Sequence, residues 1–240
     1  RYVYLDEWGN SRTHDKNAGG ACMTIGTRIC DDILEWDKQI KFPDLHEWNL
    51  EERAERFMRE EYDPNRVLKI DVHHGPFQLL ADFMGGFAEA LEAMFVEPEA
   101  TADCLNRITD WIIWLIDKIC VIYPEVDMFT VHDDWGTEKD TFFSPKMLED
   151  LLYEPTKRMI DHVHGLGKLY EFHCCGTIGR FMPYMSSLGP DFGQFQRRVN
   201  DLPAFKAQFG DKVGFNASFE GYEFGKKYSK QELIDIVRRN

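Results

Sequence analysis

The stretch Lys168-Leu-Tyr-Glu-Phe-His-Cys-Cys-Gly176 decides how this chain is interpreted. Its first five residues have strand character, and His173-Cys-Cys-Gly176 follows where that strand ends. Because side chains alternate across a strand, His173 and Cys175 are predicted to face one way and Cys174 the other. Gly176 can turn the backbone so that an imidazole and a thiolate approach one ion. The stretch is therefore either a catalytic zinc site or a buried thiol pair beside a hydrogen-bonded histidine.

Segments of strand and helix character alternate on both sides of this stretch. Strands are predicted at 67–72, 128–131, 168–174, 191–196 and 213–217, and helices at 77–95, 101–122, 145–164, 178–187 and 203–209. Pro155 predicts a kink or a new helical segment, and Ser229 with Glu232 forms a capping box for one more helix. About five β/α units predict an α/β protein with a parallel sheet, either open or closed.

The first 66 residues have a different pattern. Alternating residues around 22–29 predict a β-hairpin, joined by connecting helices to the rest of the chain rather than forming a separate domain. Residues 1–240 are therefore expected to form a single domain. The chain begins at Arg1 without a methionine and ends at Asn240 soon after a helix begins, so we expect an internal portion of a longer protein.

Composition narrows the range of partners. A net charge of -14 argues against a nucleic-acid partner and against an anionic membrane surface. The longest apolar run, 111–116, lies between Asp110 and Asp117 and is far too short to cross a bilayer. The 6 cysteines include an adjacent pair and are too few for a disulfide framework, which predicts free thiols in a reducing cytoplasm.

The predicted strands end in side chains that are common in active sites. These are His73, His74, His132, Asp133, Asp134, His173, Cys175, Gln194, Gln196 and Asn216. Each residue alone has a structural explanation, such as a histidine bonded to a loop or Asp134 capping a turn near Gly136. Because the carboxyl ends of barrel strands line the active site, the set together predicts an active site. Its predicted substrate-binding residues are His73, His74, His132, Gln194, Gln196 and Asn216.

The acidic and aromatic residues near these ends have several possible roles. Asp133 and Asp134 could ligate or orient a metal, bind a cationic or hydroxyl-bearing substrate, or act as general acid or base. Trp135, with Phe142 and Phe143, forms either an aromatic wall for substrate or ordinary packing. Glu171 lies two residues before His173 on the same face, and is a candidate catalytic carboxylate. If buried, it needs a partner, either a metal-bound His173 or Arg180.

Several motifs, in this order, resemble the uroporphyrinogen decarboxylase-like superfamily: Asp6-Glu-Trp-Gly9, Gly75-Pro-Phe77, His132-Asp-Asp-Trp-Gly-Thr137, Ser144-Pro145, Leu166-Gly-Lys168, His173-Cys-Cys-Gly176 and Phe209-Gly-Asp-Lys-Val213. They extend over nearly the whole chain. Within the superfamily they are most similar to the branch of cobalamin-dependent methyltransferases and O-demethylases. The resemblance implies a TIM-type (β/α)₈ barrel, incomplete in this chain, with the hairpin and helices as an N-terminal extension.

The resemblance also implies a chemistry. In the zinc methyltransferases of this branch, the His and Cys of His-x-Cys-Gly bind zinc, which implies His173 and Cys175 as ligands. A further ligand, often a cysteine, comes from the last part of the barrel. No cysteine follows residue 175 here, which leaves Glu171 or Asp134 as candidates. The implied cofactors are zinc and a corrinoid (cobalamin) carried by a partner protein, with a small methyl donor or acceptor.

Two metal roles and two rival functions stay open. The metal either polarises an ether oxygen, which favours a methoxylated substrate, or lowers the pKa of a thiol that accepts methyl from cobalt. The rival enzyme is a metal-free carboxy-lyase of the uroporphyrinogen decarboxylase type, with Asp133 or Asp134 as the acid. The amino-terminal arginine motif of those decarboxylases is not seen in this chain. The third reading is a non-catalytic barrel used for binding.

Overall fold

A five-stranded parallel sheet lies at the centre of the computed structural model, which describes residues 1–15, 20–44, 48–216 and 225–239. The strands are β4 (Lys69–His73), β5 (Met128–His132), β6 (Leu169–Cys174), β7 (Phe192–Phe195) and β8 (Gly214–Asn216). Each strand pairs with the next along the chain, as consecutive strands do in a (β/α)₈ barrel. The predicted α/β class and parallel sheet are confirmed, and the arrangement is that of a partial barrel.

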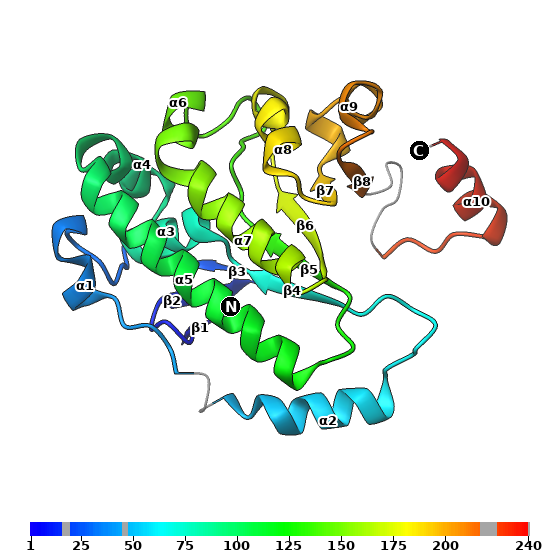
Figure 1. The fold of residues 1–240 in the computed structure, drawn as a ribbon, viewed down its shortest axis with the longest axis horizontal. Coiled ribbons are helices and arrows are strands. Elements are labelled where there is room, and N and C mark those ends of the chain that lie inside the picture. The colour runs from blue at the N-terminus through cyan, green and yellow to red at the C-terminus, as the bar shows by residue number, and fades with distance from the viewer. Residues whose placement is uncertain (16–19, 45–47, 217–224, 240) are drawn as a thin grey trace.

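Helices connect successive strands and pack on the sheet, except α10, which follows the last strand (Figure 1). Their bounds are α3 (Pro76–Met84), α4 (Phe87–Val96), α5 (Pro98–Ile122), α6 (Pro145–Met147), a π-helical turn (Leu148–Leu152), α7 (Tyr153–Gly165), α8 (Met182–Leu188), α9 (Leu202–Phe209) and α10 (Lys230–Arg239). Short 3₁₀ turns at Gly179–Phe181 and Arg197–Val199 precede α8 and α9. Among the described helices, none is both long and apolar enough to cross a membrane.

Two of the predicted helices are divided in the structure. The helix predicted over 77–95 is α3 and α4, because Gly85 takes a left-handed conformation (φ 95°) that ends α3. The helix predicted over 145–164 is interrupted by the π-helical turn, and Pro155 lies in the first turn of the new segment α7. The strand predicted over 213–217 is described as β8 only to Asn216, because Ala217 lies outside the described residues.

The N-terminal segment is a three-stranded antiparallel sheet rather than a hairpin. Its strands are β1 (Tyr2–Leu5), β2 (Ser11–Asp15) and β3 (Gly20–Met23). The alternating pattern over 22–29 leaves the sheet after Met23, because the amide of Thr27 donates to the carbonyl of Thr24 in a turn. The expected connecting helices are present as a 3₁₀ turn (Ile33–Glu35), α1 (Trp36–Gln39) and α2 (Leu50–Glu60).

This N-terminal sheet shares its hydrophobic core with the helices of the barrel. Trp8, just after β1, packs against Phe83 of α3 and Trp111 of α5, with ring centroids 5.0 and 4.5 Å apart. Both helices therefore present apolar side chains to the N-terminal segment, and the sheet lies against the end of the barrel where the parallel strands finish.

Candidate metal centre

Three histidines lie side by side at the carboxyl ends of adjacent strands. His73 of β4 pairs in register with His132 of β5, and His132 with His173 of β6. The ring centroids of His73 and His132 are 4.3 Å apart, and those of His132 and His173 are 4.2 Å apart. We call these residues the histidine row. Equal positions on parallel strands stack at the strand spacing, so the register alone produces the row.

The histidine row borders a cavity of about 470 Å³. The N-terminal sheet, α3, α4 and the strand ends contribute its lining: Arg12, Ala21, Cys22, Met23, His73, His74, Gln78, Ala81, Asp82, Gly86, Phe87, His132, Asp134, His173 and Cys175. Its volume is in the range of cavities that hold small organic ligands. The predicted site residues His73, His132 and His173 of strands β4 to β6 thus meet at one cavity.

Asp134, His173 and Cys175, which we call the cysteine set, each offer one donor atom, and these atoms lie within 4.8 Å of one another. Nε2 of His173 is 3.4 Å from Sγ of Cys175 and 3.8 Å from Oδ1 of Asp134. Donors of a tetrahedral zinc ion are separated by roughly 3.3–3.7 Å, given zinc bonds of about 2.0–2.3 Å. The His173–Cys175 separation lies in this range and the His173–Asp134 separation just above it, so the residues present fit zinc, with Asp134 as the candidate third donor.

Neighbouring groups orient the cysteine set. Nδ1 of His173 lies 2.5 Å from Oε1 of Gln194, which fixes the ring and leaves Nε2 facing the other two donors. The amide of Cys175 donates to Oδ1 of Asp134 at 2.7 Å. Burial, and next the charge of Asp134, raises the pKa of the Cys175 thiol to about 11. A bound dication would offset that charge and displace the thiol proton.

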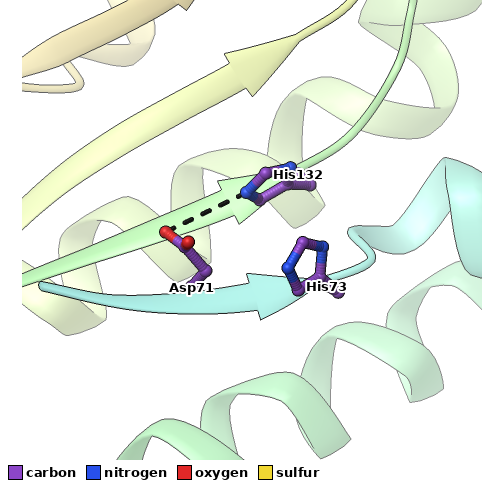
Figure 2. A group of neighbouring side chains, drawn as sticks. All are labelled: Asp71, His73 and His132. Carbon is purple, nitrogen blue, oxygen red and sulfur yellow. Dashed lines mark ion pairs between the residues drawn. The ribbon is translucent and has the colours of Figure 1, made fainter. Parts of the chain in front are cut away.

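A second group of donors lies beside the first (Figure 2). Asp71, His73 and His132, which we call the imidazole set, also place their donor atoms within 4.8 Å of one another. Burial, then the neighbouring His173 and His73, lowers the pKa of His132 to about 4. Asp71 was not among the site residues predicted from the sequence, although it lies two residues before His73, just as Glu171 lies two residues before His173.

A charged network ties the N-terminal sheet to α3 across the cavity. Asp82 of α3 accepts from Nη2 of Arg12 at 2.7 Å, and its other close contact is Nδ1 of His74, also at 2.7 Å. Nε of Arg12 donates to Asp6 at 2.8 Å. Burial alone would raise the pKa of Asp82, but His74 and Arg12 together lower it. Asp82, the single charged residue of α3, was the available sequence signal for this network.

The structure places Asp133 and Trp135 outside the cavity lining. Asp133 is 1 % exposed and accepts hydrogen bonds from the amides of Phe77 and Gln78 and, at 2.9 Å, from the indole of Trp135. Burial raises its pKa to about 7 despite these donors. Asp133 therefore caps α3. Trp135 has no exposed surface, so its expected role as an aromatic wall is replaced by packing, the alternative considered above.

Glu171 has partners other than those expected. It is 1 % exposed and accepts hydrogen bonds from Lys69 at 3.0 Å, Thr130 at 2.8 Å and Asn216 at 2.9 Å. These three donors are the partners of Glu171, in place of the predicted partners His173 or Arg180. Burial alone would raise the pKa of Glu171, but the bonds from Asn216, Thr130 and Lys69 lower it. Asn216 thus donates to the carboxylate of Glu171, and neither residue lines the cavity.

Gln196 stabilises a loop rather than lining the cavity. Its Oε1 accepts from the amide of Gly176 at 3.0 Å, directly after the cysteine set. The backbones of Gly136 and Gly176 lie so close that a Cβ added at Gly176 would be 2.2 Å from the carbonyl carbon of Gly136. This contact and Gln196 fix the turn that positions Cys175.

Comparisons with known proteins agree with this architecture. A family model described as "Uroporphyrinogen decarboxylase (URO-D)" matches residues 40–215. A solved structure named "methyltransferase from Methanosarcina mazei" matches with a TM-score of 0.63 and 11% sequence identity, over 85% of this chain and 58% of that chain. At this identity the likeness shows the fold, and this chain spans little more than half of that protein's length. No curated protein sequence matches the chain.

Proposed function

Since the chain belongs to the uroporphyrinogen decarboxylase (URO-D) family, we propose that it is a zinc-dependent methyltransferase. It would move a methyl group between a small methylated substrate, or a thiol, and the cobalt of a corrinoid protein. The observation that supports this most strongly is the convergence of Asp134, His173 and Cys175 on the wall of a cavity. The fold shared with a methanogen methyltransferase agrees with the proposal.

The cysteine set would hold the zinc ion. His173 would bind through Nε2, because Gln194 occupies Nδ1. Cys175 would bind as thiolate, and the carboxylate of Asp134 is held in place by the Cys175 amide. Zinc bound there would supply Lewis-acid chemistry to a substrate oxygen or sulfur.

The remaining lining residues favour a small, partly aromatic substrate. Phe87, Met23 and Ala81 contribute apolar surface to the wall, and the histidine row contributes polar side chains. The imidazole of His132 is neutral near pH 7, because burial lowers its pKa to about 4, so it adds no charge to the cavity wall. In demethylation, the methyl carbon would pass to the cobalt and the bonding electron pair would stay on the substrate oxygen. A methoxylated aromatic compound is therefore our first candidate.

A carboxy-lyase acting on a polycarboxylate fits the cavity less well. Among the described lining residues, Arg12 is the only arginine or lysine, and Asp6 and Asp82 already pair with it. A porphyrinogen bearing many carboxylates would need several free cations. Asp133, one candidate acid for that reaction, is buried against α3.

Metal content of the purified full chain tests the zinc assignment. We expect about one zinc ion per chain in the cysteine set, and its loss in a His173→Ala/Cys175→Ala variant, as measured by inductively coupled plasma mass spectrometry. Cys22→Ala is the matched control, because Cys22 lines the same cavity outside the set. A zinc content in the double variant equal to that of the wild type would rule the assignment out.

Methyl transfer is tested separately. The full chain is mixed with a reduced corrinoid protein and a panel of methoxylated and methylated compounds, and methyl-cobalt formation is followed by its visible absorption. Formation that requires His173 and Cys175 would support the proposal. No methyl-cobalt from any compound would contradict it.

A further inference from the structure

We propose that the imidazole set, Asp71, His73 and His132, is a second divalent-cation site, next to the cysteine set. This inference adds to the proposed function and does not rest on it. The ligands would be two imidazole nitrogens and one carboxylate oxygen, with open positions for water or a substrate oxygen.

The backbone brings these three side chains together (Figure 2). Asp71 and His73 are two residues apart on β4, so they lie on the same face of the sheet. His132 occupies the position on β5 that pairs with His73. Two histidines and one carboxylate form a donor set that zinc, cobalt, manganese and iron accept in catalytic sites with open positions.

An unsatisfied nitrogen points to a cation independently of this clustering. Nε2 of His132 is buried and has no hydrogen-bond partner. It faces Oδ1 of Asp71 at 4.0 Å, as the dashed line in Figure 2 marks. This separation is too long for a hydrogen bond. Two nitrogen or oxygen donors of one tetrahedral ion are about 3.3–3.4 Å apart, so the two atoms would approach each other by roughly 0.6 Å on binding. Because buried polar atoms are almost always partnered, an ion bound by both atoms accounts for the unpartnered nitrogen beside a carboxylate.

The two sets share no ligand and differ in chemistry. The ring of His132 stacks on that of His173 at 4.2 Å, so the sites would be neighbours. Each set contains one carboxylate, which reduces the repulsion between two cations. The cysteine set includes a soft sulfur, whereas the imidazole set offers only nitrogen and oxygen. A cation held by nitrogen and oxygen, beside a zinc site, would bind an oxygen of the substrate.

Cobalt(II) is the probe that separates the two sites. The full chain is freed of metal by a chelator and titrated with Co²⁺ alone, while the bound equivalents and the sulfur-to-cobalt absorption are measured. We expect two equivalents, of which only one carries that absorption. Asp71→Asn/His73→Gln should lose one equivalent and keep the absorption, whereas Cys175→Ser should lose the absorption and keep the equivalent bound by the imidazole set.

A matched control is Asp117→Asn/His162→Gln, which removes the same kinds of side chain from a pair 2.7 Å apart. It should still bind two equivalents. If the double variant of the imidazole set does not fold by circular dichroism, Asp71→Asn alone replaces it, since Asp71 is exposed. That variant should bind the second equivalent at least about tenfold more weakly.

One equivalent in the wild-type chain that carries the sulfur-to-cobalt absorption, or no loss of bound cobalt in the Asp71→Asn/His73→Gln variant, would overturn the inference. Absence of the sulfur-to-cobalt absorption has a different meaning, because it contradicts the cysteine set and with it the zinc assignment of the proposed function. In that case, loss of one equivalent in the Asp71→Asn/His73→Gln variant would still support the second site.

Discussion

Neighbouring residues at the ends of β5 and β6 belong to two different regions of the molecule. Asp133 and Cys174 lie in the buried core, where Asp133 caps α3 and Cys174 accepts from the amide of Trp135. Asp134 and Cys175 line the cavity. Two aspartates and two cysteines thus have opposite surroundings one residue apart. The direction in which a side chain faces, rather than its residue type, therefore decides whether it stabilises the core or is available to bind a ligand.

The largest difference is expected between the two aspartates. Asp133→Ala would leave three buried N–H donors without an acceptor, so we expect the free energy of unfolding to fall by about 4 kcal/mol. Asp134→Ala, without metal, should change it by less than about 1 kcal/mol. Urea denaturation of both metal-free variants measures the difference. Equal losses would contradict the division between core and cavity.

The two cysteines provide the same test for metal binding. Cys175→Ser should weaken zinc binding by about 100-fold or more, because a direct ligand is lost. Cys174→Ser should bind zinc as the wild type does, while its free energy of unfolding falls by about 2 kcal/mol, since a hydroxyl replaces a buried thiol. Competition with a chelator measures the affinity. Weakened binding in the Cys174→Ser variant would show that the core face takes part in the metal site.

Dependence on pH sharpens the contrast at Cys175. Its pKa of about 11 means that the thiol is protonated at neutral pH, so each zinc ion that binds releases one proton. Zinc affinity should therefore rise by about tenfold for each pH unit between about 7 and 8.5. The Cys175→Ser variant should lose this slope. A pH-independent affinity in the wild type would show that Cys175 is not a ligand.

Glu171 should give the smallest effect. Its pKa is lowered in the folded state, so the stability it contributes is present above its unfolded pKa and is lost as the pH falls through its folded pKa. Glu171→Gln should therefore show a shallower loss of stability on acidification below about pH 5, the range set by an unfolded pKa of about 4.3. Thermal unfolding between about pH 5 and 3 measures this. An unchanged slope would mean that Lys69, Thr130 and Asn216 do not stabilise the carboxylate.

Much of the fold could be predicted because its signals are local. Strand alternation placed His173 and Cys175 on one face and Cys174 on the other, as the structure shows. The positions at which helices end were harder to predict. Gly85 divides a predicted helix, because its positive φ depends on a turn that the hydrophobic pattern does not encode. The partners of Glu171 were missed, because Lys69 and Asn216 come from strands distant in sequence.

The sequence by itself determined the order of strands and helices, the polar residues at the strand ends, and the shared face of His173 and Cys175. Only the tertiary structure decided that Asp134 joins them while Asp133 does not, that Asp71 lies with His73 and His132, and that Arg12 and Asp82 join two regions across the cavity. The physical reason is the separation along the chain over which each interaction acts. Alternation and helix periodicity act between near neighbours, whereas register between strands and packing of the N-terminal sheet bring together residues 39 to 70 positions apart.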